Sequence, residues 1–111
     1  MGIGHTAAVS LLGVVGSVVD VEADIAPGMP GITVVGMGDT AVAQARDRVR
    51  AAVLNSGFGW PQTRLTVSLA PAGVHKRGAG FDLAIAVALL AAAEVVPARR
   101  VREAVLVGEL G

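Results

Sequence analysis

Residues 64–93 read RLTVSLAPAGVHKRGAGFDLAIAVALLAAA, and this stretch decides the fold of the chain. Its first seven residues alternate in polarity and place Leu65, Val67 and Leu69 on one face, which predicts a central strand. Pro71 and the glycine two residues later end that strand, because proline lacks an N–H group and glycine favours turns.

The second part of the stretch predicts a buried helix over residues 81–93. Asp82 is the only charged residue in it, so the helix has no polar face and must be covered on nearly all sides. The loop between strand and helix is therefore carried by two rigid elements. It holds the only local cluster of His, Lys and Arg in the chain, which is His75, Lys76 and Arg77.

The rest of the chain supplies the remaining elements. We expect a hairpin of strands over residues 5–12 and 14–25, a strand over 32–35, a helix from 39 or 40 to about 56, a basic connector over 97–102 and a strand over 103–110. The order β-β-β-α-β-α-β predicts an α/β (α+β) two-layer sandwich, in which both helices cover one face of a mixed sheet.

The strand over residues 14–25 has one polar face. Asp20, Glu22 and Asp24 point one way, while the apolar residues between them point the other. A solvated sheet face explains this pattern better than metal binding does, because acidic residues that alternate on a strand usually face water. We expect no metal site in these residues.

The helix that begins near residue 39 has a charged side and an apolar side. Arg46 and Arg50 are four residues apart and share one face. We favour a solvated face that Asp47 partly neutralises, with an interface or nucleic-acid contact as the alternative. Gly57 is the expected C-cap. The apolar stripe is expected to consist of Val42, Ala45, Val49, Ala52 and Val53.

The composition excludes several classes of protein. With 111 residues the chain is one domain, residues 1–111, that is large enough for a real core. It has no cysteine, so disulfides, thiol catalysis and cysteine-type zinc sites are excluded. The longest apolar run, residues 83–93, is far shorter than the roughly twenty residues of a membrane span. We expect a cytoplasmic protein that does not bind membranes.

Charge balances at nine basic and nine acidic residues, which argues against a strongly nucleic-acid-binding module and leaves room for a local basic patch.

The turn at residues 36–38 lies where a phosphate loop would lie, but no Lys-Ser or Lys-Thr pair follows it. We therefore expect a tight turn and no ATP binding. Lys76 and Arg77 could hold an anion beside the backbone amides of their loop, although a solvated surface loop is favoured.

A catalytic serine is hard to place. The chain has four serines, and Ser68, inside the central strand, has no base near it in sequence. No serine lies close to His75. We expect no catalytic residue and no cofactor-binding residue in this chain.

Taken together, the motifs resemble those of a known family. They come in this order: Thr33-Val34-Val35-Gly36, Arg46-Asp47-Arg48-Val49-Arg50-Ala51-Ala52, Asn55-Ser56-Gly57-Phe58, Leu69-Ala70-Pro71-Ala72, Phe81-Asp82-Leu83-Ala84-Ile85-Ala86 and Val107-Gly108-Glu109-Leu110. The pattern is similar to the N-terminal domain of the magnesium-chelatase-like AAA+ proteins of the ComM/YifB family. The resemblance covers nearly the whole chain.

The resemblance implies a fold and a context. The fold would be that of the Lon protease domain, the GHMP-kinase N-terminal domain and the second domain of a small-subunit ribosomal protein, with a left-handed crossover. Family members continue into an AAA+ ATPase module, bind ATP and Mg²⁺ there and assemble as homo-oligomeric rings. ComM-type members act in DNA branch migration during natural transformation. The chain would then be a non-catalytic accessory domain, truncated at its C-terminal end.

The resemblance also bears on hydrolysis and on DNA. Gly80 stands where Lon proteases carry their nucleophilic serine, and the partner lysine would lie beyond the chain. A Lon-like hydrolase fragment and a magnesium-chelatase-type subunit domain remain the alternatives. Contacts with DNA or with neighbouring domains are expected first at Lys76 and Arg77, where no acid lies nearby before Asp82, and second at Arg46 and Arg50.

Overall fold

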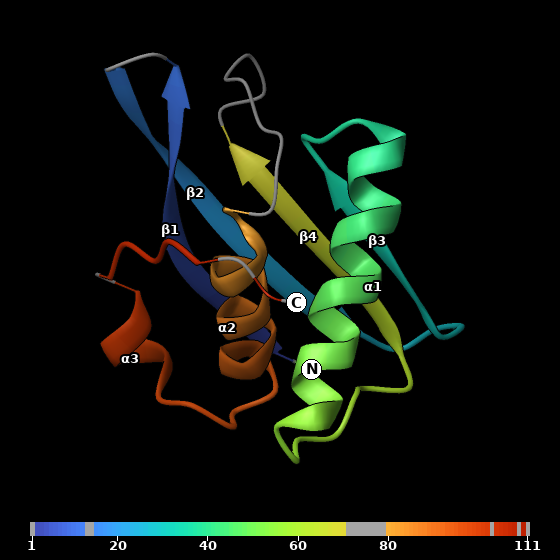
Figure 1. Ribbon diagram of the computed structural model, residues 1–111. Coiled ribbons are helices and arrows are strands. Elements are labelled where there is room, and N and C mark those ends of the chain that lie inside the picture. Colours follow the sequence, from blue (N-terminus) through green and yellow to red (C-terminus); the bar gives the residue numbers. More distant parts are fainter. Residues whose placement is uncertain (1, 13–14, 71–79, 103, 109, 111) are drawn as a thin grey trace.

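The computed structural model describes residues 2–12, 15–70, 80–102, 104–108 and 110, and it shows two layers (Figure 1). A four-stranded sheet forms one layer, and the helices α1 and α2 lie together on one of its faces. The elements are β1 (Gly2–Leu12), β2 (Val15–Ala26), β3 (Gly31–Val35), α1 (Asp39–Asn55), β4 (Arg64–Ala70), α2 (Asp82–Ala92) and α3 (Ala98–Val101). The predicted two-layer arrangement is confirmed.

The strands follow the order β1-β2-β4-β3 across the sheet. β1 and β2 form the predicted antiparallel hairpin, in which Leu12 pairs with Val15. β2 also pairs antiparallel with β4, and β3 pairs parallel with β4. The sheet is therefore mixed, as predicted, and β4 lies inside it with a neighbour on each side.

The connection from β3 through α1 to β4 is left-handed. In Figure 1 both strands run upwards, α1 lies in front of the sheet, and the chain moves from β3 on the right to β4 on the left. Most crossovers between parallel strands are right-handed. The crossover expected from the family resemblance is therefore present.

Leu65, Val67 and Leu69 of β4 are buried, as their alternation predicts.

Glycines of β1 allow α2 to lie close to the sheet. On β1, a Cβ atom at Gly4 would run into the backbone carbonyl of Ala88 on α2. Because both glycines of β1 face α2 in this way, the helix packs almost directly on the strand.

The helix α2 is apolar on all sides, as predicted, and eight of its eleven residues are buried. Phe81 before it is buried as well. α1 turns three residues of its predicted stripe into the core, which are Ala45, Val49 and Val53. No helix in the described part of the chain is long and apolar enough to cross a membrane.

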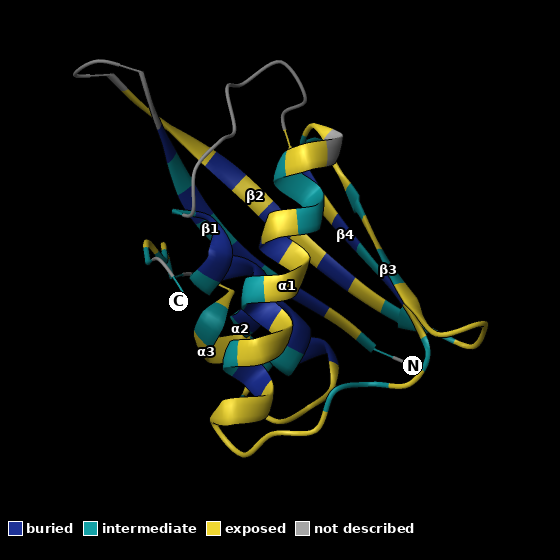
Figure 2. Ribbon diagram, turned by 45° about the vertical axis from the view of Figure 1, so that its right-hand side comes forward, coloured by how far each residue is buried: buried dark blue, intermediate teal, exposed yellow. Residues whose placement is uncertain are grey.

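The face of the sheet opposite the helices is exposed along β2, where exposed and buried residues alternate (Figure 2). Along β2, Asp20, Glu22 and Asp24 are exposed, while Val19 and Val21 are buried. The predicted acidic outer face is confirmed. Within the described residues, no group of three or more His, Cys, Asp or Glu side chains could hold a metal ion.

The predicted strand over residues 103–110 is wrong. Its described part makes a single bridge to the sheet, in which Val105 lies parallel to Ala7 and the Leu106 N–H donates to the Ala7 carbonyl at 2.7 Å. Two residues further on, the Leu83 N–H of α2 donates to the Gly108 carbonyl. The segment is held by β1 at one point and by α2 at the next, so it leaves the sheet instead of extending a ladder.

The predicted connector over residues 97–102 also differs from the structure, since it contains the short helix α3. Pro97 is its N-cap, and Arg99 and Arg100 lie exposed in its last turn. Pro97 has an extended backbone, with φ −66° and ψ 114°, so the helix begins only after it.

Candidate functional site

Of the two predicted basic clusters, the structure describes only one. Lys76 and Arg77 lie outside the described residues, so their role stays a prediction. Arg46 and Arg50 lie exposed on α1, as their spacing predicts, and both line one pocket. That pocket is the candidate site.

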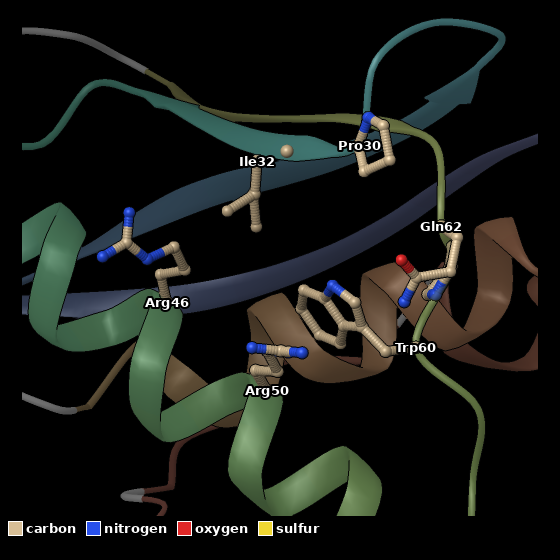
Figure 3. Close-up of a pocket in the computed structure, with 8 residues that line it drawn as sticks. Pro30, Ile32, Arg46, Arg50, Trp60 and Gln62 are labelled. Atoms are coloured by element: carbon tan, nitrogen blue, oxygen red, sulfur yellow. The ribbon is translucent and has the colours of Figure 1, made fainter.

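The pocket has a volume of about 330 Å³ and lies between β3, α1 and the connection from α1 to β4 (Figure 3). The two arginines extend from α1, and Trp60 and Gln62 reach it from the connection. No acidic side chain belongs to the lining. The lining residues are Pro30, Gly31, Ile32, Arg46, Arg50, Trp60, Pro61 and Gln62.

Trp60 is held in place by the core. It is the only tryptophan of the chain, and it is partly buried against the hydrophobic cluster beneath the helices. Trp60 thus lies at the edge of the core, whereas Phe58, two residues before it, is exposed. The approach of Trp60 to the arginines was missed, because it depends on how the chain folds back after α1.

The two arginines differ in their surroundings. Arg46 Nε lies 3.4 Å from Asp47 Oδ1, and both side chains are well exposed. Such a surface ion pair contributes about 1 kcal/mol or less, so an incoming anion can replace it. Among the described residues Arg50 has no ion pair. The pocket therefore keeps a net positive charge.

Arg48 lies between these two in sequence but belongs to another contact. Its Nε donates to Asp82 Oδ2 at 2.5 Å, and its Nη2 donates to Asp82 Oδ1 at 3.1 Å. Asp82 lies in the first turn of α2, as predicted, and its side chain is only 1% exposed. The sequence gives no sign of this two-pronged pair, because 34 residues separate its members.

The glycine turn before α1 has the backbone of a tight turn. Gly36 has a φ of 101°, which side chains rarely adopt, and a Cβ atom there would meet the Leu69 carbonyl. Gly38 is extended and serves as the N-cap of α1. The close approach of Leu69 therefore explains why residue 36 is a glycine, and no bound ligand is needed to explain it.

A row of polar side chains crosses the outer face of the sheet. In the strand register Ser68 pairs with Glu22, and Glu22 pairs with His5. His5 Nδ1 lies 3.9 Å from Glu22 Oε2, which is too far for a hydrogen bond. In a serine hydrolase the imidazole lies between the serine and the acid, whereas here the carboxylate lies between the other two. The row was missed in the sequence, because only the strand register brings it together.

The fold and the pocket define a small sheet domain with a basic pocket, which is lined by Arg46 and Arg50. A family model described as subunit ChlI of Mg-chelatase matches residues 21–111. The chain therefore belongs to the magnesium-chelatase-like family, and the relatives it matches confirm the ComM/YifB branch that the motifs resemble.

Three relatives illustrate the relationship. YifB of Escherichia coli is 48% identical over 110 residues, which are 99% of this chain and 21% of the relative. A protein of Mycobacterium tuberculosis is 44% identical over 110 residues, or 99% of this chain and 22% of the relative. Competence protein ComM of Haemophilus influenzae is 41% identical over 99 residues, which are 89% of this chain and 19% of the relative. The chain thus spans about a fifth of the length of these curated relatives.

Proposed function

We propose that the chain is a non-catalytic accessory domain of a magnesium-chelatase-like AAA+ ATPase that acts on DNA. One observation carries the proposal: the chain matches its relatives over nearly its whole length yet spans only about a fifth of theirs. A unit of this size leaves the larger part of such proteins for an ATPase module. The relative named as a competence protein supports a role in DNA processing.

In this proposal the whole protein is cytoplasmic and forms a homo-oligomeric ring, with ATP and Mg²⁺ bound by the AAA+ module. The accessory domain contacts that module and DNA. The loop with Lys76 and Arg77 is one candidate contact, and the face with Arg46 and Arg50 is the other.

A second candidate function is that of a magnesium-chelatase-type subunit, which would serve metal insertion into a tetrapyrrole. The description of the matching family model favours it. A protein of this kind would not need DNA for its activity, so the same experiment separates the two candidates.

The test compares the full-length protein with a variant that lacks residues 1–111. ATP hydrolysis without DNA and migration of a branched DNA substrate are measured, and sedimentation velocity reports the assembly of the ring. We expect basal ATP hydrolysis to stay within about twofold and DNA processing to fall at least tenfold, a difference of about 1.4 kcal/mol. Unchanged DNA processing in an assembled ring would contradict the proposal.

A further inference from the structure

The pocket of Arg46 and Arg50 brings two kinds of group together, guanidinium groups and an indole. Guanidinium groups bind phosphate oxygens in a two-pronged geometry and stay charged at any relevant pH. Trp60 presents an indole to the same hollow (Figure 3). A cationic groove with an aromatic platform is the combination by which proteins bind single strands of nucleic acid.

The size and the walls of the pocket fit one nucleotide. Its volume of about 330 Å³ is at the small end of ligand pockets, which span about 300–1,000 Å³. Pro30, Ile32 and Pro61 supply apolar walls, and Gln62 supplies an amide that can both donate and accept hydrogen bonds. The bases of a duplex are stacked inside it and cannot reach Trp60.

The charges are available before any ligand arrives. The lining contains two arginines and no acid, and the described residues give Arg50 no ion pair. The pair between Arg46 and Asp47 is exposed and weak. Because Trp60 packs on the core, binding costs little ordering of the aromatic platform.

We propose that this pocket binds single-stranded DNA, with one unpaired base against Trp60 and the neighbouring phosphates on Arg46 and Arg50. The inference rests on the proposed action on DNA and locates the contact on α1 and the connection after it. It assigns the contact to Arg46 and Arg50 and not to Lys76 and Arg77.

The single tryptophan makes the test direct, because all indole emission comes from the pocket. The 111-residue chain is titrated with a thymidine oligonucleotide about ten nucleotides long, a length that suits single-strand sites. We expect saturable quenching of the emission, and binding at least tenfold weaker for a duplex of the same length. Labelled oligonucleotide followed by anisotropy gives the affinity independently.

The variant Arg46→Ala with Arg50→Ala is compared with Arg99→Ala with Arg100→Ala, which removes the same charge from the exposed surface of α3. The first pair should bind at least tenfold more weakly, and its salt slope should fall by about 1.4, or about 0.7 for each lost phosphate contact. The second pair should bind like the parent chain.

Trp60 needs its own control, since it also packs on the core. Trp60→Leu should lose about tenfold in anisotropy titrations, because stacking on one base contributes about 1–3 kcal/mol. Trp60→Phe should keep most of the affinity, since it retains an aromatic face. Circular dichroism confirms that each variant is folded.

Four outcomes would overturn the inference. They are an absence of quenching, equal binding of the duplex, equal competition by inorganic phosphate, and a loss confined to Lys76→Ala with Arg77→Ala. If deletion of residues 1–111 abolishes DNA processing while the pocket variants bind normally, the proposed function stands and this site is wrong. If the pocket binds single strands but the deletion changes nothing, the proposed function fails instead.

Discussion

Asp82 is the one charged side chain that lies buried among the described residues. A buried carboxylate is costly unless a partner and hydrogen bonds replace its water. Arg48 provides both through two donor groups on one rigid fork. The pair joins α1 to α2.

The two members of this pair should differ in their contribution to stability. Arg48→Ala leaves the carboxylate of Asp82 buried, so we expect a loss of about 3 kcal/mol in the free energy of unfolding. Asp82→Ala should cost less, because the Arg48 side chain is 28% exposed and can turn towards water. Urea unfolding followed by circular dichroism measures both.

The double variant Arg48→Met with Asp82→Leu serves as the control for that pair. Apolar side chains of similar size often replace a buried ion pair at little cost. We expect the double variant to lose less stability than Arg48→Ala alone, because it leaves no unpaired carboxylate buried. A loss as large as that of Arg48→Ala would contradict this account of the pair.

At the same scale, part of the candidate site could be predicted from the sequence. The shared face of Arg46 and Arg50 follows from their spacing, because residues four apart lie together on a helix. The approach of Trp60 to that face could not be predicted, and neither could the partner of Arg48. Both depend on contacts between elements, which no local pattern encodes.

Among the elements, α2 packs on β1 at the closest distance that the backbone allows. A Cβ atom at Gly4 would meet the Ala88 carbonyl, the Ala92 nitrogen and the Ala91 methyl group. Two of these three atoms belong to the helix backbone and cannot turn aside. The glycine is therefore required by the helix above it and not by its own strand.

We expect Gly4→Ala to lower the free energy of unfolding by about 1–3 kcal/mol, the usual cost of an overpacked core. Gly59→Ala is the matched control, because a Cβ atom there meets nothing within 4 Å. It should change stability by less than about 0.5 kcal/mol. Thermal unfolding of both variants gives the comparison, and an equal loss at the two positions would contradict the close packing.

The elements also show where prediction from sequence succeeds and fails. β4 and α2 have strong periodic patterns, and their burial follows those patterns. The strand expected over residues 103–110 has alternation too. Among its described residues, however, only Leu106 donates a hydrogen bond to β1, and Val105 and Val107 are exposed. Alternation predicts a strand only where the chain stays beside a neighbouring edge. Here the segment passes from β1 to α2, where the Leu83 N–H donates to the Gly108 carbonyl.

For the whole molecule, we expect no reaction with a fluorophosphonate probe, which labels activated serines. Gly80 stands where the resemblance to Lon proteases would place the nucleophile. The row of Ser68, Glu22 and His5 has the carboxylate in the middle, so His5 cannot take a proton from the serine. A serine hydrolase labelled in parallel is the positive control. Labelling that disappears in Ser68→Ala would reveal a hydrolytic site on the outer face.

The position of β4 inside the sheet has a consequence for synthesis. Among the described residues β3 pairs only with β4, and β2 needs β4 as its second neighbour. A ribosome adds about 5–20 residues each second. After β3 is made, synthesis of residues 36–63 therefore takes on the order of seconds, and during this time β3 has no β4 to pair with. Through that interval the nascent chain can hold a hairpin and a helix, but it has no sheet that unites them.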